Sequence, residues 1–381
     1  MNNLYHYVEE FTKYSRDCEH SLSEKIDFLL NMDAHHFTQD VHIKPQAYVR
    51  LISGLSETCP STALSFAMHL YTQWGLQKIG VDEKLIHSVL KESASGRLFA
   101  SLNEPGFYFL REDQLNPEQF SVHARKTEQG YVINGVKKFV SLEPYVHFLP
   151  VYCYVDNPSE QEGRIAVLLI RRSSEGISVK PDWDTISMSE SNSNSLLFDN
   201  VSVPYIDALF TAKDALQKTN VFGYLFRLSI VSVYYGIAKR AYDFVKEYCR
   251  SKQVPHTNRA LSFFPGVQFS VAEMSILLET SFSQITRYSN LLDDVLSGKL
   301  VSDNISNISL ITKELVTRNA EQIVNIAMKI SGISSIGKSN ILSKLYQDVK
   351  AGGFHPPQSD VAYEMIAKYE LGVLTHRTRW L

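Results

Sequence analysis

The hydrophobic period of this chain changes twice, and no other feature constrains its fold as strongly. Apolar residues recur with a helical spacing up to about residue 98. From Phe99 to Pro204 they alternate with polar residues in short runs separated by turn signals. A helical spacing returns from about Asp207. Because each period is typical of one kind of secondary structure, the sequence predicts helices, then strands, then helices again.

These changes predict an α+β multidomain protein. About 100 residues of consecutive strands favour a central β-barrel or β-sandwich. Three long helical patterns follow, at residues 222–250, 267–296 and 305–330, and their lengths suit a four-helix-bundle domain. The predicted domains are an N-terminal helical domain at residues 1–98, a central β domain at 99–206 and a C-terminal helical bundle at 207–381.

Composition excludes several classes of function. A net charge of −3 without a long Lys/Arg run gives no sign of nucleic-acid binding. The four cysteines form no Cys-x-x-Cys pair, so neither a zinc site nor a disulfide framework is expected. The N-terminus lacks the order of a signal peptide, and no apolar run approaches membrane-spanning length. We therefore expect a soluble cytoplasmic protein with no metal, no membrane and no nucleic acid among its partners.

One loop near the C-terminus is a candidate for chemistry. A helical pattern ends at Lys350, and Gly352-Gly353 and Pro356-Pro357 stop it on either side of His355. A rigid loop that presents one imidazole between two helices can serve a reaction, and the alternative is a tight turn with a surface histidine. His69 lies among apolar residues of an earlier helical pattern, where a histidine is usually a core or interface residue.

Four motifs, in order along the chain, resemble segments of the acyl-CoA dehydrogenase superfamily. They are Leu102-Asn103-Glu104-Pro105-Gly106, the hairpin Gly130 to Ser141, Leu197 to Pro204, and Tyr235 to Ala241. The helical, β and helical parts also follow the order of that family. Together they identify the chain as a member, with an acyl-CoA dehydrogenase-like fold expected over nearly its whole length.

The resemblance implies a flavin between the β domain and the C-terminal helices. Leu102 and Asn103 would line one side of its ring, and Phe139 and Ser141 would stack near it and form hydrogen bonds. From the residues alone, ordinary strand packing is the alternative for Phe139 and Ser141. The cofactor expected for the family is FAD, and Lys252 stands where the family has an arginine that reaches the cofactor phosphates. Lysine lacks the bidentate fork, and two other cofactor-binding segments of the family are replaced, by Phe107-Tyr108-Phe109 and by Gly332-Ile333-Ser334-Ser335. These three changes make FMN an alternative.

The catalytic glutamate of the family's dehydrogenases is missing. Removal of an α-proton from an acyl thioester needs a positioned base. The usual position of that base falls on Pro356, and a second position found in some members falls on Phe226. Neither side chain can accept a proton. Glu364 lies about two helical turns further on, where it would point elsewhere.

The flavin-monooxygenase branch of the same superfamily resembles this chain more closely at these positions, since it has a histidine beside the ring. His355 matches that histidine, and His69, Asn103 and Ser141 match its other polar positions. The leading hypothesis is therefore a flavin-dependent oxidoreductase that performs oxygen chemistry on a small organic substrate, with His355 and His69 as catalytic residues. The alternatives are an acyl-CoA dehydrogenase with His355 or Glu364 as a substitute base, and a degenerate flavin-binding protein without catalysis. The resemblance also implies a homotetramer.

Overall fold

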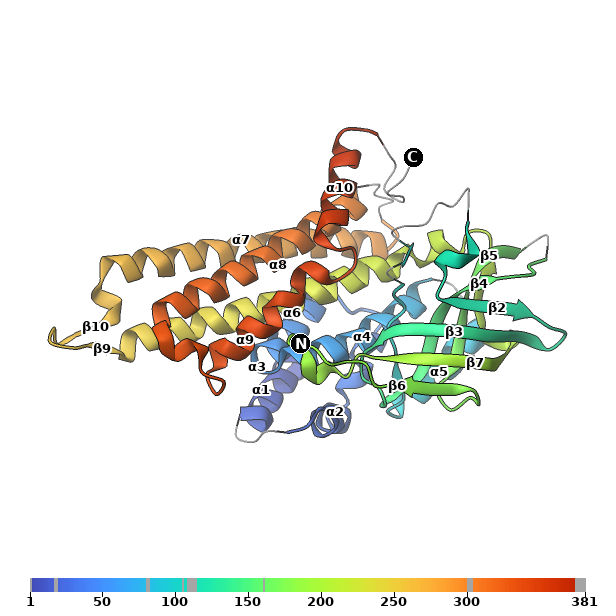
Figure 1. The fold of residues 1–381 in the computed structure, drawn as a ribbon, viewed down its shortest axis with the longest axis horizontal. Helices are drawn as coiled ribbons and strands as arrows, with labels where there is room; N and C mark the ends of the chain where they lie inside the picture. Colours follow the sequence, from blue (N-terminus) through green and yellow to red (C-terminus); the bar gives the residue numbers. More distant parts are fainter. Residues whose placement is uncertain are drawn as a thin grey trace.

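The computed structural model describes residues 2–16, 20–79, 83–104, 106–107, 115–159, 162–299 and 304–373. Pro105, which belongs to the first of the four motifs, lies outside these ranges, as do Tyr108 and Phe109. The molecule is elongated, with a twisted sheet at one end, long helices at the other and the N-terminal helices packed beside their junction (Figure 1). The order of helices, strands and helices is the predicted one. The three domain boundaries stay a prediction.

The N-terminal part is helical. Its α-helices are α1 (Asn2–Arg16), α2 (Leu22–Asn31), α3 (Pro45–Thr58), α4 (Pro60–Lys78) and α5 (Glu83–Ala94), with a short 3-10 helix, η1 (Ala34–Gln39). Helix α4 is buried on all sides along most of its length, from Pro60 to Leu76. A helix that is buried all round belongs to the centre of a fold, and both faces of α4 therefore contribute to the interior.

The central strands form one mixed sheet. They are β1 (Leu98–Phe99), β2 (Val122–Lys126), β3 (Gly130–Val140), β4 (Val146–Val155), β5 (Glu162–Arg171), β6 (Ile177–Lys180), β7 (Asn194–Pro204) and β8 (Ala208–Ala212). The strand order is β6-β7-β3-β2-β4-β5-β8, with β1 beside β4. The path of the described strands ends at β6 and β8, so the sheet is not the closed barrel that was one of the two expected forms. Alternation of apolar residues predicts strands, but it does not say whether the first strand pairs with the last.

Long helices make up the C-terminal part. They are α6 (Ala215–Ser251), α7 (Pro265–Leu296) and α8 (Ile305–Ser331), and they lie side by side in Figure 1. Two short strands, β9 (Gln253–Val254) and β10 (Arg259–Ala260), join α6 to α7. The chain then forms α9 (Ile341–Val349), a 3-10 turn called η8 (Lys350–Phe354) and α10 (Ser359–Glu370).

Helix α6 corrects one expectation from the sequence. It is long and apolar enough to cross a membrane by length and composition. However, 78% of its most apolar window is buried inside the protein, where it packs against α3, α4, α7 and α8. Its apolar character is accounted for by these contacts, as expected for the core helix of a globular domain.

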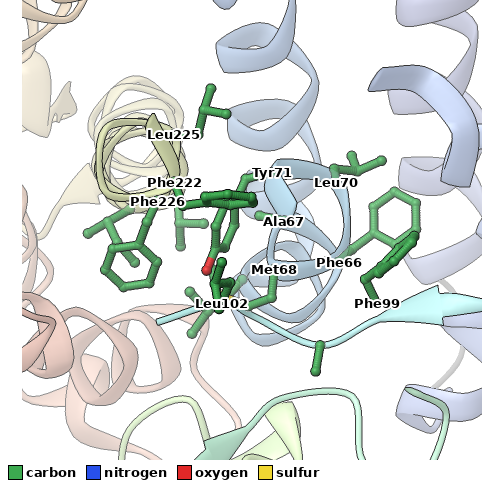
Figure 2. Close-up of a cluster of buried hydrophobic side chains, with 14 of the residues drawn as sticks. Phe66, Ala67, Met68, Leu70, Tyr71, Phe99, Leu102, Phe222, Leu225 and Phe226 are labelled. Carbon is green, nitrogen blue, oxygen red and sulfur yellow. The ribbon is translucent and has the colours of Figure 1, made fainter. Parts of the chain in front are cut away.

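The junction between α4 and α6 is tightly packed. A Cβ atom placed on Gly75 of α4 would lie only 2.4 Å from the Phe222 ring of α6, so glycine permits this close approach. Figure 2 shows the apolar side chains here, with Met68 and Tyr71 of α4 facing Phe226 of α6. On another side of α4, Phe66 lies towards Phe99 of β1. This packing fixes the two helices that form one side of the candidate site.

The segment between β6 and β7 is joined to both helical parts. Its 3-10 helix η4 (Ser189–Ser191) carries Glu190, which accepts from Lys25 Nζ of α2 at 3.1 Å and from Lys344 Nζ of α9 at 2.5 Å. The Asp348 carboxylate of α9 accepts from the Met188 backbone N–H at 2.9 Å. Three parts of the chain that are far apart in sequence therefore meet at one place.

Candidate active site

A cavity of about 350 Å³ lies where these three parts meet. Its wall is mostly apolar and includes Leu64 and Met68 of α4, Phe226 of α6 and Met188. The polar groups on the wall come from a small set, namely Ser101, Asn103, Ser141, Ser193, His355 and Gln358. None of the described lining residues carries a charged side chain at neutral pH. An apolar cavity with a few converging polar groups is typical of a small-molecule site.

His355 lies on this wall, in the loop between η8 and α10. Its Nε2 is 3.0 Å from the hydroxyl oxygen of Tyr234, a fully buried residue of α6. The His355 ring also meets the Phe226 ring edge to face, with the ring centres 6.5 Å apart. Phe226 and Tyr234 are eight residues apart on α6, so they share a face of that helix and together position the imidazole.

The Tyr234 hydroxyl determines which ring nitrogen of His355 carries the proton. Within the described residues, His355 Nε2 is the one hydrogen-bond partner of that hydroxyl. A buried phenol needs an acceptor, so its O–H donates to Nε2. Burial, with a smaller effect of Lys313, lowers the pKa of His355 to about 3, so the ring is neutral at pH 7. The neutral ring therefore carries its proton on Nδ1, the nitrogen that Tyr234 does not engage.

His69 has a different environment from the predicted one. It is fully buried and does not line the cavity. Leu64 and Met68, four residues apart on α4, face the cavity, whereas His69 is rotated about 100° from Met68 around the helix. Its Nε2 donates to the His35 carbonyl at 2.7 Å, and its Nδ1 accepts from the Phe99 N–H at 3.1 Å. Since both ring nitrogens serve the backbone, the geometry gives His69 a structural role in place of the predicted catalytic one.

Three of the predicted cofactor-binding residues lie on the cavity wall. The Asn103 amide forms no hydrogen bond to another described residue, so it is available to a bound molecule. Ser141 Oγ lies 2.9 Å from Ser193 Oγ, which places two hydroxyls together on the wall. Phe139 is 55% exposed, and its ring meets the Trp183 ring at a centroid distance of 6.2 Å. Its backbone adopts a φ of +59°, a conformation that is uncommon for a residue other than glycine.

The other two predicted cofactor-binding residues do not line the cavity. Leu102 is 3% exposed and does not line it; Figure 2 draws Leu102 among the apolar side chains around Met68. Lys252 is exposed at the end of α6, beside the β9–β10 hairpin and far from the sheet (Figure 1). Phe226 and Lys252 are separated by about 39 Å along the helix axis at 1.5 Å per residue. Within one chain, Lys252 therefore cannot reach a molecule in this cavity.

The two predicted base positions both lie on the cavity wall, as Pro356 and Phe226. Glu364, the nearest carboxylate considered from the sequence, does not line the cavity and accepts instead from Lys368 Nζ at 2.7 Å. No described lining residue has a carboxylate. The one titratable side chain on the described wall is the imidazole of His355.

The wall is suited to a planar aromatic ring system. The Phe139 and Trp183 rings, the Ser141 and Ser193 hydroxyls and the Asn103 amide provide an apolar surface with a few donors and acceptors. An isoalloxazine ring, which is flat and bears polar atoms along its edges, needs this combination. The described wall residues therefore fit the ring of a flavin.

Two buried residues near the site were not identified from the sequence. Tyr234 directly precedes the Tyr235 to Ala241 motif, and its position eight residues after Phe226 is the signal that could have revealed it. Asp348 is 3% exposed, and its Oδ2 has no hydrogen-bond partner within the described chain. Burial raises the pKa of Asp348 to about 6. A buried carboxyl with one unpaired oxygen could be suspected only once the fold was known.

Comparison with known proteins agrees with the resemblance seen in the four sequence motifs. Family models of the acyl-CoA dehydrogenase middle domain and C-terminal domain match residues 113–201 and 223–370. A putative acyl-CoA dehydrogenase of Bacillus subtilis, YdbM, is 26% identical over 310 residues, which cover 80% of this chain and 77% of that protein. A dibenzothiophene monooxygenase of Rhodococcus erythropolis is 28% identical over 259 residues, 64% of this chain and 58% of that protein.

Solved structures show the same fold. TdsC from Paenibacillus sp. A11-2, solved with FMN and indole, superposes with a TM-score of 0.84 at 16% sequence identity. The match covers 99% of this chain and 98% of TdsC. Both dehydrogenases and monooxygenases are thus among the proteins that this chain resembles.

Proposed function

The chain belongs to the acyl-CoA dehydrogenase superfamily, and we propose that within it the protein is a flavin-dependent oxidoreductase that performs monooxygenase-type oxygen chemistry on a small organic substrate. The observation that carries this proposal is the state of His355. The ring lies on an apolar cavity, its Nε2 is hydrogen-bonded to Tyr234, and the tautomer inferred from that bond places its N–H at Nδ1. The cavity offers a proton donor where the family's dehydrogenases have a carboxylate base.

The direction of the hydrogen bond between Tyr234 and His355 distinguishes oxygenation from proton abstraction by a base, as in the family's dehydrogenases. Abstraction of a substrate proton needs a free lone pair on the base. His355 in the tautomer set by Tyr234 presents a hydrogen instead, which can stabilise an electron-rich oxygen and transfer a proton to it. The wall around the ring is mostly apolar, with Leu64, Met68 and Phe226, so few polar groups compete for that proton.

Reduced flavin would supply two electrons to the reaction, in which one atom of O₂ enters the substrate and the other leaves as water. The chain's own residues bind and orient the reactants. Ser141 and Asn103 would hydrogen-bond the ring of the cofactor, with Phe139 and Trp183 against it, and His355 would hold the proton at Nδ1. FAD is the cofactor expected from the family, and FMN is the alternative. Chromatography of the flavin released from the purified protein distinguishes them.

The alternative is α,β-desaturation of an acyl-CoA thioester, and the similarity to YdbM favours it. It requires His355 or Glu364 to act as the base. His355 would have to exchange its tautomer, and Glu364 would have to leave Lys368. Each change costs free energy before the reaction begins, so the geometry supports this alternative less well.

One experiment compares the two reactions directly. The protein is mixed with reduced FMN or FAD, ¹⁸O₂ and either indole or dibenzothiophene as neutral aromatic probes. In parallel, butyryl-CoA is offered with an artificial electron acceptor. We expect a product that carries one ¹⁸O atom, seen by mass spectrometry. Rapid acyl-CoA desaturation without ¹⁸O incorporation would show that the proposal is wrong and the alternative is right.

We also propose a homotetramer, as the family resemblance implies. Apolar side chains of α7 support it, since Phe269 is 75% and Ile276 is 64% exposed in the single chain. A second copy could bring its own Lys252 towards the cofactor phosphates of the first. Light scattering measures the mass in solution, and a monomer would contradict this part of the proposal.

A further inference from the structure

A fully buried lysine lies under the loop that carries His355. Lys313 of α8 is 0% exposed. Its Nζ donates to Glu314 Oε1 at 2.7 Å and to the Pro357 carbonyl oxygen at 3.1 Å. Burial of an ammonium group is costly unless the charge is paired and hydrogen-bonded. Here the buried cation is paired with Glu314, and it holds the backbone two residues beyond His355.

The loop is seated on two helices at once. A Cβ atom on Gly352 would lie 2.9 Å from Thr317 Cβ of α8 and 3.0 Å from a ring carbon of Tyr234 on α6. Glycine therefore allows η8 to pack directly on both helices. Thr317 is one helical turn from Lys313 on α8, so Lys313 and Thr317 meet the loop from the same face. Tyr234 contacts it from the other helix, and its hydroxyl reaches His355.

We propose that Lys313 is a positioning residue of the active site, which holds the Pro357 carbonyl so that the loop keeps the His355 ring on the cavity wall. This inference rests on the proposed function for its effect on turnover. Pro357 itself lines the cavity, so the same contact fixes part of the wall that faces a substrate. The ammonium also places a positive charge near the imidazole, which disfavours a second proton on that ring.

Other charged and titratable groups lie on the helices that flank the loop. They are Tyr234 and Arg227 on α6, Glu314 on α8, Asp348 on α9, and Asp360 and Glu364 on α10. Of the charged side chains in this set, Arg227 donates to Ser309, Asp348 accepts from Met188 and Glu364 accepts from Lys368. Glu314 pairs with Lys313 itself, so a variant that removes only the lysine leaves a buried carboxylate without its partner.

The test therefore uses a charge-balanced variant. Lys313→Met combined with Glu314→Gln removes the pair without leaving a buried charge. Lys313→Arg retains a donor that can reach the carbonyl. Lys350→Met is the matched control, because Lys350 begins η8 and forms its ion pair, with Glu321, on the surface side of the loop. Thermal unfolding establishes that each variant is folded before it is compared.

The first readout needs neither flavin nor turnover. Protein labelled with [ε1-¹³C]histidine is titrated by NMR, and the His355 signal is assigned by its loss in His355→Gln. In the native protein we expect no titration of this signal above pH 5, in keeping with a pKa of about 3. In the double variant we expect the pKa to rise far enough for the signal to titrate above pH 5, because the cation is lost and the loosened loop admits water. An unchanged His355 titration in a folded double variant would overturn the proposal.

The second readout is the oxygenation rate. We expect kcat of the double variant to fall roughly tenfold to hundredfold, because a small displacement of a catalytic group has effects of this size. KM should change little, Lys313→Arg should restore part of the rate, and Lys350→Met should behave as the native protein. If the native protein lacks oxygenase activity but the His355 signal responds, the proposed function fails and the positioning role stands. If the native protein is active and the variants alter neither readout, the positioning role fails alone.

Discussion

The two histidines that the sequence singled out, His69 and His355, have the same charge state and different surroundings. Burial is the main cause that lowers the pKa of each to about 3. His69 gives both ring nitrogens to the backbone, through His35 and Phe99. His355 gives one nitrogen to Tyr234 and lies on the cavity wall. A perturbed pKa therefore does not separate the two histidines, whereas the hydrogen bonds of the second ring nitrogen do.

Removal of His355 should have the largest effect on activity. We expect His355→Ala to lower the oxygenation rate by about 10²–10⁴-fold, the usual contribution of a positioned proton donor. The free energy of unfolding should fall by about 1–3 kcal/mol, because alanine leaves the buried Tyr234 hydroxyl without its acceptor. Steady-state kinetics and thermal unfolding measure the two effects. His123→Ala is the control, since His123 pairs with Asp156 on the sheet. Full activity in His355→Ala would show that His355, like His69, has no catalytic role.

Removal of His69 should have the opposite result. We expect His69→Ala to lower the free energy of unfolding by about 3–5 kcal/mol, because it leaves a cavity and two unpaired buried backbone groups. Urea unfolding measures the loss. A stable His69→Ala protein without activity would instead give His69 the catalytic role predicted from the sequence.

Asp348, a buried carboxyl of α9, resembles His355 in that one of its polar atoms has no hydrogen-bond partner within the described chain. Its pKa is raised to about 6 by burial, above the value of about 3.9 in an unfolded chain. The folded state thus binds the proton more tightly, and the contribution to stability is present below pH 4 and lost as pH rises through 6. This difference corresponds to about 3 kcal/mol. Urea unfolding from pH 4 to pH 7 should show this decline in the native protein and its absence in Asp348→Asn. Parallel curves would show that Asp348 has no raised pKa.

The smallest effect is expected for Tyr234→Phe. The variant keeps the ring that packs on the loop and removes the hydroxyl that sets the tautomer of His355. One such hydrogen bond contributes about 1 kcal/mol, so the oxygenation rate should fall roughly fivefold to tenfold. Tyr235→Phe, at the neighbouring position, is the control. An unchanged rate would mean that the tautomer does not depend on Tyr234.

The sequence predicted the order of secondary structure and the superfamily, but it did not predict that the sheet stays open. Periodicity reports the face on which each residue lies, and it carries that information within a single segment. Whether β6 and β8 meet depends on twist and on connections over many residues. The open sheet replaced the expected barrel for that reason.

The candidate site was predicted in part. Asn103, Phe139, Ser141 and His355 all lie on the cavity wall, although their roles stay proposals. His69 was placed wrongly because neighbouring residues of a buried helix face different surroundings, and α4 is apolar on all sides. Tyr234 and Lys313 were missed because a buried tyrosine or lysine looks the same in a sequence as one on the surface.

The position of the cavity, with walls from α4, from the segment before β7, from α6 and from the loop after η8, has a consequence for finding the ligand. A molecule that contacts all of these parts binds the folded chain and has no comparable site on the unfolded one. At a hundred times its dissociation constant it adds about 2.7 kcal/mol to the free energy of unfolding. The melting temperature is thus a sensor for the substrate, and a library of small neutral compounds can be ranked by thermal shift before any reaction is assumed.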